Sequence, residues 1–152
     1  MAAEQFNVRD YRFEIEIFAS PGTWQPIGPK GIETCEPGFD YETADTTTFG
    51  SNGQAEGQNM QISKTMQLEG KRLRDKVTGA IDTGQAMVEA QAERLGDDSL
   101  IGWRFAHKDD TTWIVWPQAY FQLGAQGGGT NEKGKWGVTV NRSGPSTTAV
   151  KV

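Results

Sequence analysis

The chain has 152 residues, among them 19 glycines, and a formal net charge of −5. Only 28 residues are Leu, Ile, Val or Phe, but the aromatic residues (five Trp, seven Phe, three Tyr) and the low net charge exclude a disordered chain and predict one domain with an aromatic core. The acidic balance argues against a nucleic-acid reader, which needs a basic stripe to contact phosphates, and no stretch approaches the ~18 apolar residues of a membrane-spanning helix.

The first part of the chain carries strand patterns separated by a turn-rich segment. Residues 10–19 alternate apolar and polar side chains, which predicts a strand with one apolar face made of Tyr11, Phe13, Ile15 and Ile17. The density of Pro and Gly over residues 21–31 predicts irregular structure there. A second strand is expected over residues 31–41, where Pro37 and Gly38 would bulge it or confine it to a sheet edge.

Residues 42–57 contain one large apolar residue, Phe49, and no periodicity, so they predict a long loop. Loops of this length in a compact domain are usually functional or disordered. The next strand is expected over residues 58–69. One of its faces is apolar apart from Lys64, and the opposite face is polar and almost uncharged.

After residue 82 the hydrophobic period changes to that of a helix. Asp82 or Thr83 is a candidate N-cap and Gly96 a candidate stop, so we expect one helix over about residues 83–95 with a narrow apolar stripe made of Val88, Ala92 and Leu95. Strand alternation then returns at residues 101–107, at 113–123 with a break or bulge at Pro117, and at 135–141 with three residues facing the core, Trp136, Val138 and Val140.

Five or more short strands with hairpin-like connections and one helix predict a mainly β domain, an antiparallel β-sandwich or barrel with one flanking helix. The chain shows no internal repeat or linker, so residues 1–152 form a single expected domain with flexible termini at residues 1–9 and 142–152. Trp116 is out of phase with its strand and is expected to be exposed or in an interface. The other strand tryptophans are expected in the core, namely Trp103, Trp113 and Trp136.

Residue types that carry catalysis or bind metals are scarce. The single histidine, His107, has no evident orienting partner, and a Cys35–His107 dyad pairs two isolated residues without further support. Asp109 and Asp110 are adjacent in a turn and are expected to cap it rather than to act as a paired acid and base. No calcium loop and no His or Cys metal spacing is present. We therefore expect no enzymatic activity, no cofactor, no metal, and a structural role for Cys35.

Two glycine motifs and the scattered tryptophans leave alternatives open. Gly127-Gly128-Gly129 lacks the following helix and the Lys of a phosphate-binding loop, so a hairpin turn is expected. Gly22-Thr23-Trp24 is similar to the Gly-x-Trp of small-ligand-binding up-and-down barrels. An exposed Trp could instead stack on sugars in a carbohydrate- or receptor-binding sandwich.

A different combination of features favours assembly. The domain is small and acidic, and it has a long polar loop and a strand with a polar, almost uncharged face. Uncovered strand edges pair readily with a neighbouring chain, and a loop of this length can reach one. These are the parts of a self-assembling subunit.

The order of these elements resembles the major tail tube proteins of long-tailed (siphovirus-type) bacteriophages. The resemblance covers about residues 10–141 and rests on the Thr-rich loop from Asp45 to Gly53, the polar strand, and three later features: the helix opening Asp82-Thr83-Gly84-Gln85-Ala86, the strand Trp103-Arg104-Phe105 and the turn before Trp136. It implies a structural virion protein whose hexameric rings stack into a tube for DNA ejection. It also implies assembly in the host cytoplasm, a place in the virion tail, contacts with terminator, tape measure and distal tail proteins, no membrane partner, and passage of DNA without specific binding.

The resemblance assigns two sets of residues. A sheet from each subunit would line the channel, and a wall without Lys or Arg would not hold DNA. The candidates for this wall lie on the polar face of residues 58–69, namely Gln61, Ser63, Thr65, Gln67 and Glu69. Arg72 and Arg74 lie just beyond this strand and fit the picture only at a ring interface. The long loop would contact the adjacent ring through Asp45, Thr46, Thr47, Thr48, Phe49, Ser51 and Asn52.

Overall fold

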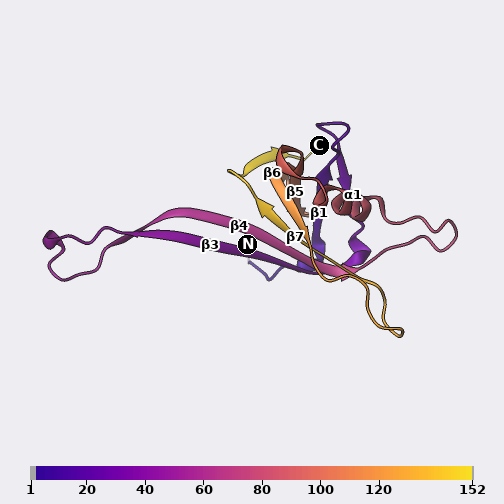
Figure 1. Ribbon diagram of the computed structural model, residues 1–152, viewed down its shortest axis with the longest axis horizontal. Helices are drawn as coiled ribbons and strands as arrows, with labels where there is room; N and C mark the ends of the chain where they lie inside the picture. The colour runs from indigo at the N-terminus through magenta and orange to yellow at the C-terminus, as the bar shows by residue number, and fades with distance from the viewer. Residues whose placement is uncertain (1–2, 152) are drawn as a thin grey trace.

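The computed structural model describes residues 3–151, which form one antiparallel sheet of eight strands and one α-helix (Figure 1). The strands are β1 (Tyr11–Glu16), β2 (Trp24–Pro26), β3 (Ile32–Asp45), β4 (Gly57–Lys71), β5 (Ile101–His107), β6 (Thr112–Leu123), β7 (Lys135–Arg142) and β8 (Thr147–Val150). Their order in the sheet is β2-β1-β5-β6-β7-β4-β3, with β8 also paired to β6. The helix α1 spans Thr83–Ala92, and single 3-10 turns lie at Val8–Asp10, Pro29–Gly31, Phe49–Ser51 and Gly96–Ser99.

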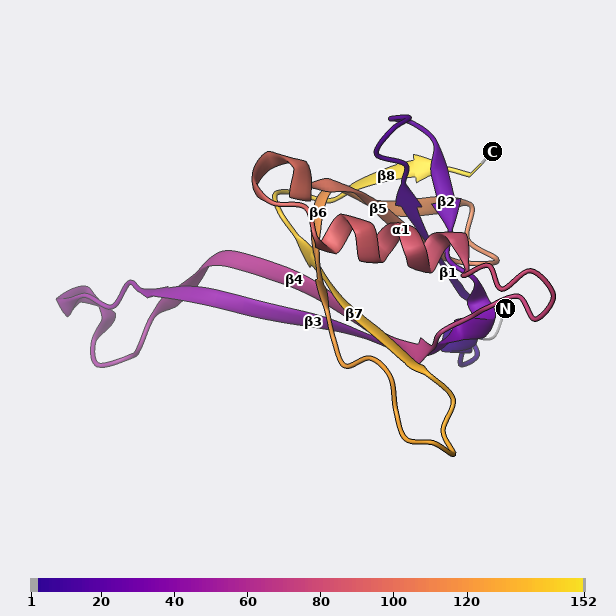
Figure 2. The same cartoon turned by 45° about the vertical axis from the view of Figure 1, so that its right-hand side comes forward.

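The mainly β, antiparallel class with one helix is confirmed, and the expected sandwich or barrel takes the form of a single open sheet. The sheet curves around its own core, and α1 lies within the curve (Figure 2). The core is aromatic, as the composition predicts: Trp103 and Trp136 are fully buried, and the Trp103 ring stacks on Phe13 at 5.9 Å between centroids. Phe121 meets Trp103 edge-on at 5.6 Å.

The predicted loop over residues 42–57 is too long. β3 continues to Asp45 and β4 starts at Gly57, so only residues 46–56 lie outside the strands. Residues 42–45 of β3 show no alternation of apolar and polar side chains because nearly all of their side chains are exposed. Backbone pairing with β4, rather than burial, holds them in the sheet. Pro37 lies on β3, which is the edge strand of the sheet, and this confirms that its segment is confined to an edge.

The expected positions of two tryptophans are reversed. Trp116 is buried, with its ring edge-on to Phe105 at 5.5 Å, whereas Trp113 is only half-buried. The predicted irregularity at Pro117 is the cause. Trp103 pairs with Trp116 and Ile101 pairs with Ala119. One residue separates the two partners on β5 but two residues separate them on β6, so β6 carries one extra residue there. A bulge of one residue exchanges the faces of all residues before it.

Helix α1 begins where the capping signal places it and ends early. The side chain of Asp82 accepts a hydrogen bond from the Gln85 backbone N–H at 3.1 Å. The helix stops at Ala92, so Leu95 is exposed rather than part of the apolar stripe, while Val88 is fully buried. Gln85 is also fully buried, and its amide accepts from Leu73 N at 3.0 Å and donates to Lys71 O at 3.0 Å, which fastens the helix to the end of β4.

Two short strands lie where irregular or flexible chain is expected. β2 occupies the middle of the turn-rich segment 21–31 and pairs with β1. Within the C-terminal segment 142–152, β8 pairs with β6, and the Lys151 ammonium donates to His107 O at 2.8 Å. The strands have three and four residues, too few for an apolar period to mark them. In the N-terminal segment 1–9, residues 1–2 lie outside the described residues, as does residue 152.

Candidate assembly surfaces

The distal part of the β3–β4 hairpin projects from the sheet as an arm, which we define as residues 38–63 (Figure 1). The register runs without a break from Gly38, opposite Thr65, to Glu42, opposite Gln61, and shifts once before the end of the arm. Residues 38–63 carry four acidic residues and no Lys or Arg, and the first basic residue toward the sheet is Lys64, opposite Phe39. The arm is therefore an exposed, anionic projection held together by a backbone ladder.

The tip of the arm, residues 46–56, is ordered by hydrogen bonds of its own. Hydrogen bonds from the Thr47 side chain and from Thr47 N, the latter at 2.9 Å, hold the pKa of the exposed Asp45 carboxyl below its usual range. Thr47 Oγ1 accepts from Glu56 N at 2.9 Å and donates to Glu56 O at 3.2 Å, and a capping box of Thr48 and Ser51 closes the 3-10 turn. Phe49 stands fully exposed on this turn. All seven predicted loop residues gather here, with Asp45 as the last residue of β3.

The five residues predicted to line a channel share one face of β4, pointing away from the core. The register extends this polar face across four strands. It adds Glu36, Asp40 and Glu42 on β3, Thr139 and Asn141 on β7, and Tyr120 and Gln122 on β6. Together these positions hold four carboxylates and no Lys or Arg. The β3 carboxylates were missed by sequence reasoning, although their alternation with Pro37, Phe39 and Tyr41 is the signal that identifies them.

The opposite face of the arm is apolar and unpartnered. Met66 and Leu68 lie in the core, but farther out along the same face Ile62, Phe39 and Tyr41 are exposed, with exposed fractions of 39%, 59% and 51%. The ammonium of Lys64 lies 5.7 Å from the centre of the Phe39 ring. The apolar surface of the core therefore continues along the arm, beyond the residues that the subunit itself buries.

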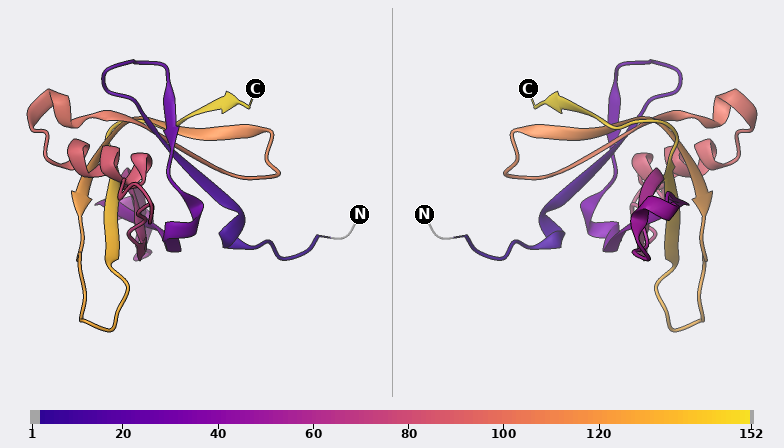
Figure 3. Two further views of the ribbon diagram at one scale, coloured as in Figure 1. Left: turned by 90° about the vertical axis from the view of Figure 1, so that its right-hand side faces the viewer. Right: turned by 90° about the vertical axis from the view of Figure 1, so that its left-hand side faces the viewer.

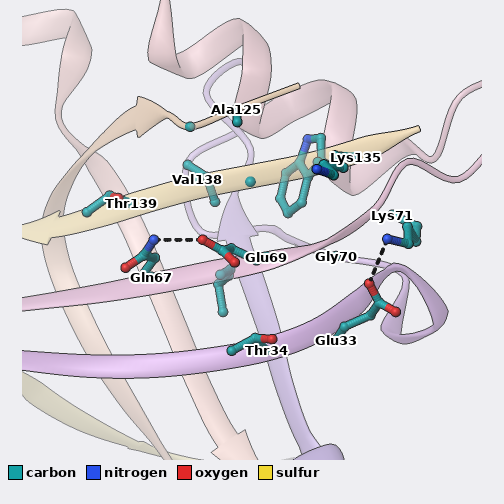
Figure 4. Close-up of a pocket in the computed structure, with 14 residues that line it drawn as sticks. Glu33, Thr34, Gln67, Glu69, Gly70, Lys71, Ala125, Lys135, Val138 and Thr139 are labelled. Atoms are coloured by element: carbon teal, nitrogen blue, oxygen red, sulfur yellow. Dashed lines mark hydrogen bonds and ion pairs between the residues drawn. The ribbon is translucent and has the colours of Figure 1, made fainter. Parts of the chain in front are cut away.

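A hollow of about 330 Å³ lies at the root of the polar face, where β3, β4 and β7 run side by side (Figure 4). Three glycines are among the residues that line it, Gly70, Gly124 and Gly137. Its charged groups are already engaged: Gln67 Nε2 donates to Glu69 at 2.8 Å, and Lys71 lies 3.3 Å from Glu33. The hollow thus has the shape of a shallow contact surface rather than of a reaction site.

Cys35 and His107 do not form a dyad, because no hydrogen bond joins them within residues 3–151. Burial raises the pKa of the Cys35 thiol to about 11, so the sulfur is protonated at neutral pH. His107 Nδ1 accepts from Asp109 N at 3.2 Å, and its ring lies edge-on to Tyr11 at 5.7 Å and to Phe6 at 5.9 Å. The histidine thus packs the N-terminal segment against β5.

The described residues hold neither a metal-binding cluster nor a membrane-spanning helix. No cluster of three or more His, Cys, Asp or Glu side chains in this part of the chain is placed to hold a metal ion. No helix in residues 3–151 is long and apolar enough to cross a membrane.

The fold of this chain is similar to that of solved chains from phage-like tail assemblies. A chain from the tail of an empty gene transfer agent particle, solved with C6 symmetry, superposes with a TM-score of 0.66 at 16% identity, covering 96% of this chain and all of the other. A chain from the six-fold symmetrised baseplate of the anti-feeding prophage matches with a TM-score of 0.60 at 13% identity, covering 99% and 98%. A chain from the sheath–tube complex of an extracellular contractile injection system, in its extended state, matches with 0.58 at 8% identity, covering 97% and 93%. No family model and no curated protein sequence matches the chain.

Proposed function

We propose that this chain is the tube subunit of a phage-like tail, a structural virion protein that assembles in the host cytoplasm into six-membered rings stacked as a tube. The observation that carries the proposal is the likeness of fold over nearly the whole chain to components of three tail assemblies. Two of those assemblies were solved with six-fold symmetry, which supports the ring size. The expected siphovirus-type tail stays a prediction, since one of the three assemblies is contractile.

The polar face fits the wall of a DNA conduit. Lys or Arg side chains on such a wall would release counterions from phosphates and add affinity that does not depend on sequence. The face instead presents carboxylates, hydroxyls and amides across four strands. Like charges repel the DNA weakly over the short screening length of physiological salt. We therefore propose that Gln61, Ser63, Thr65, Gln67 and Glu69 face the lumen.

Ring closure needs an edge that a second subunit can meet. β3 is the outermost strand over 14 residues, so one side of its backbone is unpaired within the described subunit. Pro37 removes one donor from this edge, and the nearby carboxylates discourage random pairing of free subunits. The exposed apolar side chains Phe39, Tyr41 and Ile62 lie beside the same edge and would be covered in a ring.

Other tail proteins are the remaining partners that we propose. Chains of this fold occur in the structures of the baseplate and of the tube-terminating cap of the anti-feeding prophage. A terminator, a tape measure and a distal tail protein are the corresponding partners here. Genomic DNA would pass through without being bound.

The two alternative binding functions gain no support from the geometry. The half-buried Trp24 and Trp113 do not form a free platform for sugars, because the Arg104 guanidinium lies between them, at 4.5 and 4.6 Å from their ring centres. The interior of the curved sheet is filled by Trp103, Trp136 and their neighbours. It therefore does not offer the internal cavity that a small-ligand-binding barrel needs.

The proposal is tested directly by electron microscopy of the purified protein. We expect negative-stain images to show six-fold rings or tubes, and light scattering coupled to size-exclusion chromatography to show a species of six subunits. A protein that stays monomeric at every concentration and salt would contradict the proposal.

Placement of the polar face in the lumen is tested by adding positive charge to it. In a phage that carries this protein, Q61K together with T65K should slow DNA ejection about tenfold, because each added ammonium can contact phosphates as the DNA passes. The matched control is T111K with T112K, two exposed threonines at the β5–β6 turn. Ejection at the control rate would show that the polar face lies elsewhere.

A further inference from the structure

The end of the molecule opposite the arm tip is basic. Two loops project there, the β4–α1 connection and the β6–β7 connection, as Figures 1 and 2 show. Figure 3, which looks along the arm, shows that the β6–β7 connection also extends below the sheet. We define the basic end as residues 71–76 and 132–135, which contain two acidic residues, Asp75 and Glu132, against six basic ones: Lys71, Arg72, Arg74, Lys76, Lys133 and Lys135. The backbone joins the two loops, since Arg72 N donates to Gly134 O at 2.9 Å.

The basic end has a defined shape. Arg74 and Ile81 form a β-bridge, and the turn between them is closed by Asp75, which accepts from Val77 N at 2.7 Å and from Thr78 N at 3.0 Å. These bonds hold the pKa of the Asp75 carboxyl below its usual range. Val77 stands at the end of the turn with 94% of its surface exposed. An exposed apolar residue within a basic loop is the counterpart of the exposed Phe49 at the tip of the anionic arm.

Half of the cations at the basic end have no partner of their own. Lys71 pairs with Glu33, Arg72 with Glu89 and Lys135 with Glu132. Within residues 3–151, Arg74, Lys76 and Lys133 lie within 4 Å of no carboxylate. The arm shows the converse, because its four carboxylates face no Lys or Arg within the arm. Each end thus carries uncompensated charge of one sign.

We propose that the basic end is the docking site for the arm of a second copy of this chain. The inference rests on the proposed stacked-ring function and deepens it by naming the surface that receives the arm. Two complementary surfaces at opposite ends of one subunit make a heterologous, head-to-tail contact, which repeats without limit unless a rotation closes it. Stacking along the arm direction would bring the carboxylates of each tip to the turn around Val77 in the next ring. The position of Arg74 beyond the polar strand is then explained by a ring interface.

Charge complementarity of this kind sets the direction and rate of association more than its strength. Exposed ion pairs are individually weak, but a ring boundary would repeat the contact in every subunit. The Debye length falls from about 8 Å at physiological ionic strength to about 3 Å at 1 M, so tube growth should slow at high salt. The exposed Phe49 and Val77 would supply the part of the contact that salt does not weaken.

A charge swap tests the proposal. E56K at the arm tip and K76E at the basic end should each raise the critical concentration for tube growth about tenfold, and E56K/K76E should recover most of the loss. Within residues 3–151 no ion pair or hydrogen bond involves the Lys76 side chain. E56K keeps the backbone bonds between Glu56 and Thr47 but removes the bond that the Glu56 carboxylate accepts from Ser51 Oγ at 2.8 Å, so recovery in the double variant is the result that separates lost charge from a loosened tip. K108E, in the β5–β6 turn, is the control for a charge reversal away from the basic end; it breaks the ion pair between Lys108 and Asp10 (3.6 Å), so it is a stricter control than K76E requires, and it should leave growth unchanged.

The outcomes separate this inference from the proposed function. Suppose that the wild-type protein forms tubes. If E56K or K76E then has the critical concentration of the wild type, the arm does not dock on the basic end. The same conclusion follows if the critical concentration of E56K/K76E is as high as that of the more impaired single variant. The tube function would stand in that case. If the wild-type protein forms neither rings nor tubes at low salt, the proposed function itself fails. Six-fold rings without stacks in K76E, together with tubes in the double variant, would support both.

Discussion

Replacing residues 46–56 by Asn-Gly should give a folded protein that no longer stacks into tubes. The Asp45–Gly57 pair ends the β3–β4 ladder, so a two-residue type I′ turn can join the strands at this point. The tip contributes nothing to the core, since Phe49 is fully exposed and most of the tip's hydrogen bonds are internal. We expect a circular dichroism melting curve within a few degrees of the wild type. Electron micrographs should show rings at most, because the segment that reaches the next ring is gone.

A second variant separates the length of the arm from its chemistry. A tip of the same length made only of Gly and Ser keeps the reach of the loop and removes Phe49, Glu56 and the threonine network. We expect it to stack poorly as well, since a flexible tip must be ordered on binding and offers no apolar or charged contact. Tubes of normal length from the Asn-Gly variant would show that the tip has no part in stacking. Tubes from the Gly and Ser variant alone would assign the contact to the backbone of the arm.

Sequence reasoning succeeds where burial imposes a period. The β1 and β7 strands each place a row of apolar side chains in the core, with Phe13 and Ile15 on one and Trp136, Val138 and Val140 on the other, and both are predicted from alternation. The capping carboxyl of Asp82 likewise fixes the start of α1. These elements can be predicted from sequence because one face of each contacts the core.

The arm escapes prediction for the opposite reason. Its distal strands are solvated on both faces in the isolated subunit, so Thr43, Ala44 and Asp45 carry no apolar period even though they are paired with β4. If the proposed ring is correct, the environment that selects these residues is another subunit, which a single chain does not contain. The same reasoning applies to Phe39 and Tyr41, whose side chains look misplaced until a neighbour covers them.

The prediction of which β6 tryptophan faces the core is wrong for a different reason. The extra residue at Pro117 and Gln118 is indicated by the proline itself, but its consequence is a change of phase. Counting by twos from Ala119 and Phe121 through the bulge places Trp113 in the core, whereas the register places Trp116 there. A predicted bulge therefore has to be carried through to every residue beyond it.

This change of phase leads to the largest stability effect that we expect. Trp116 is 3% exposed and packs edge-on against Phe105, so W116A would leave a cavity lined by core residues. Truncation of a buried Trp costs about 3–5 kcal/mol, a large share of the stability of a typical domain. For a chain of this length, that loss corresponds to a melting temperature lower by roughly 10 °C or more. The measurement is chemical or thermal unfolding of the monomeric protein at low concentration.

W113A is the matched control, because it removes the same side chain from the same strand on the other side of the bulge. The Trp113 ring is half-buried and contacts the Arg104 guanidinium at 4.6 Å and the Lys151 ammonium at 4.9 Å. Its loss forfeits two cation–π contacts of about 0.5–1 kcal/mol each and partial burial, so its cost should be well below that of W116A. Alternation without the bulge predicts the reverse order. A larger destabilisation by W113A than by W116A would therefore contradict the register of β6 on the Trp113 and Trp116 side of the bulge.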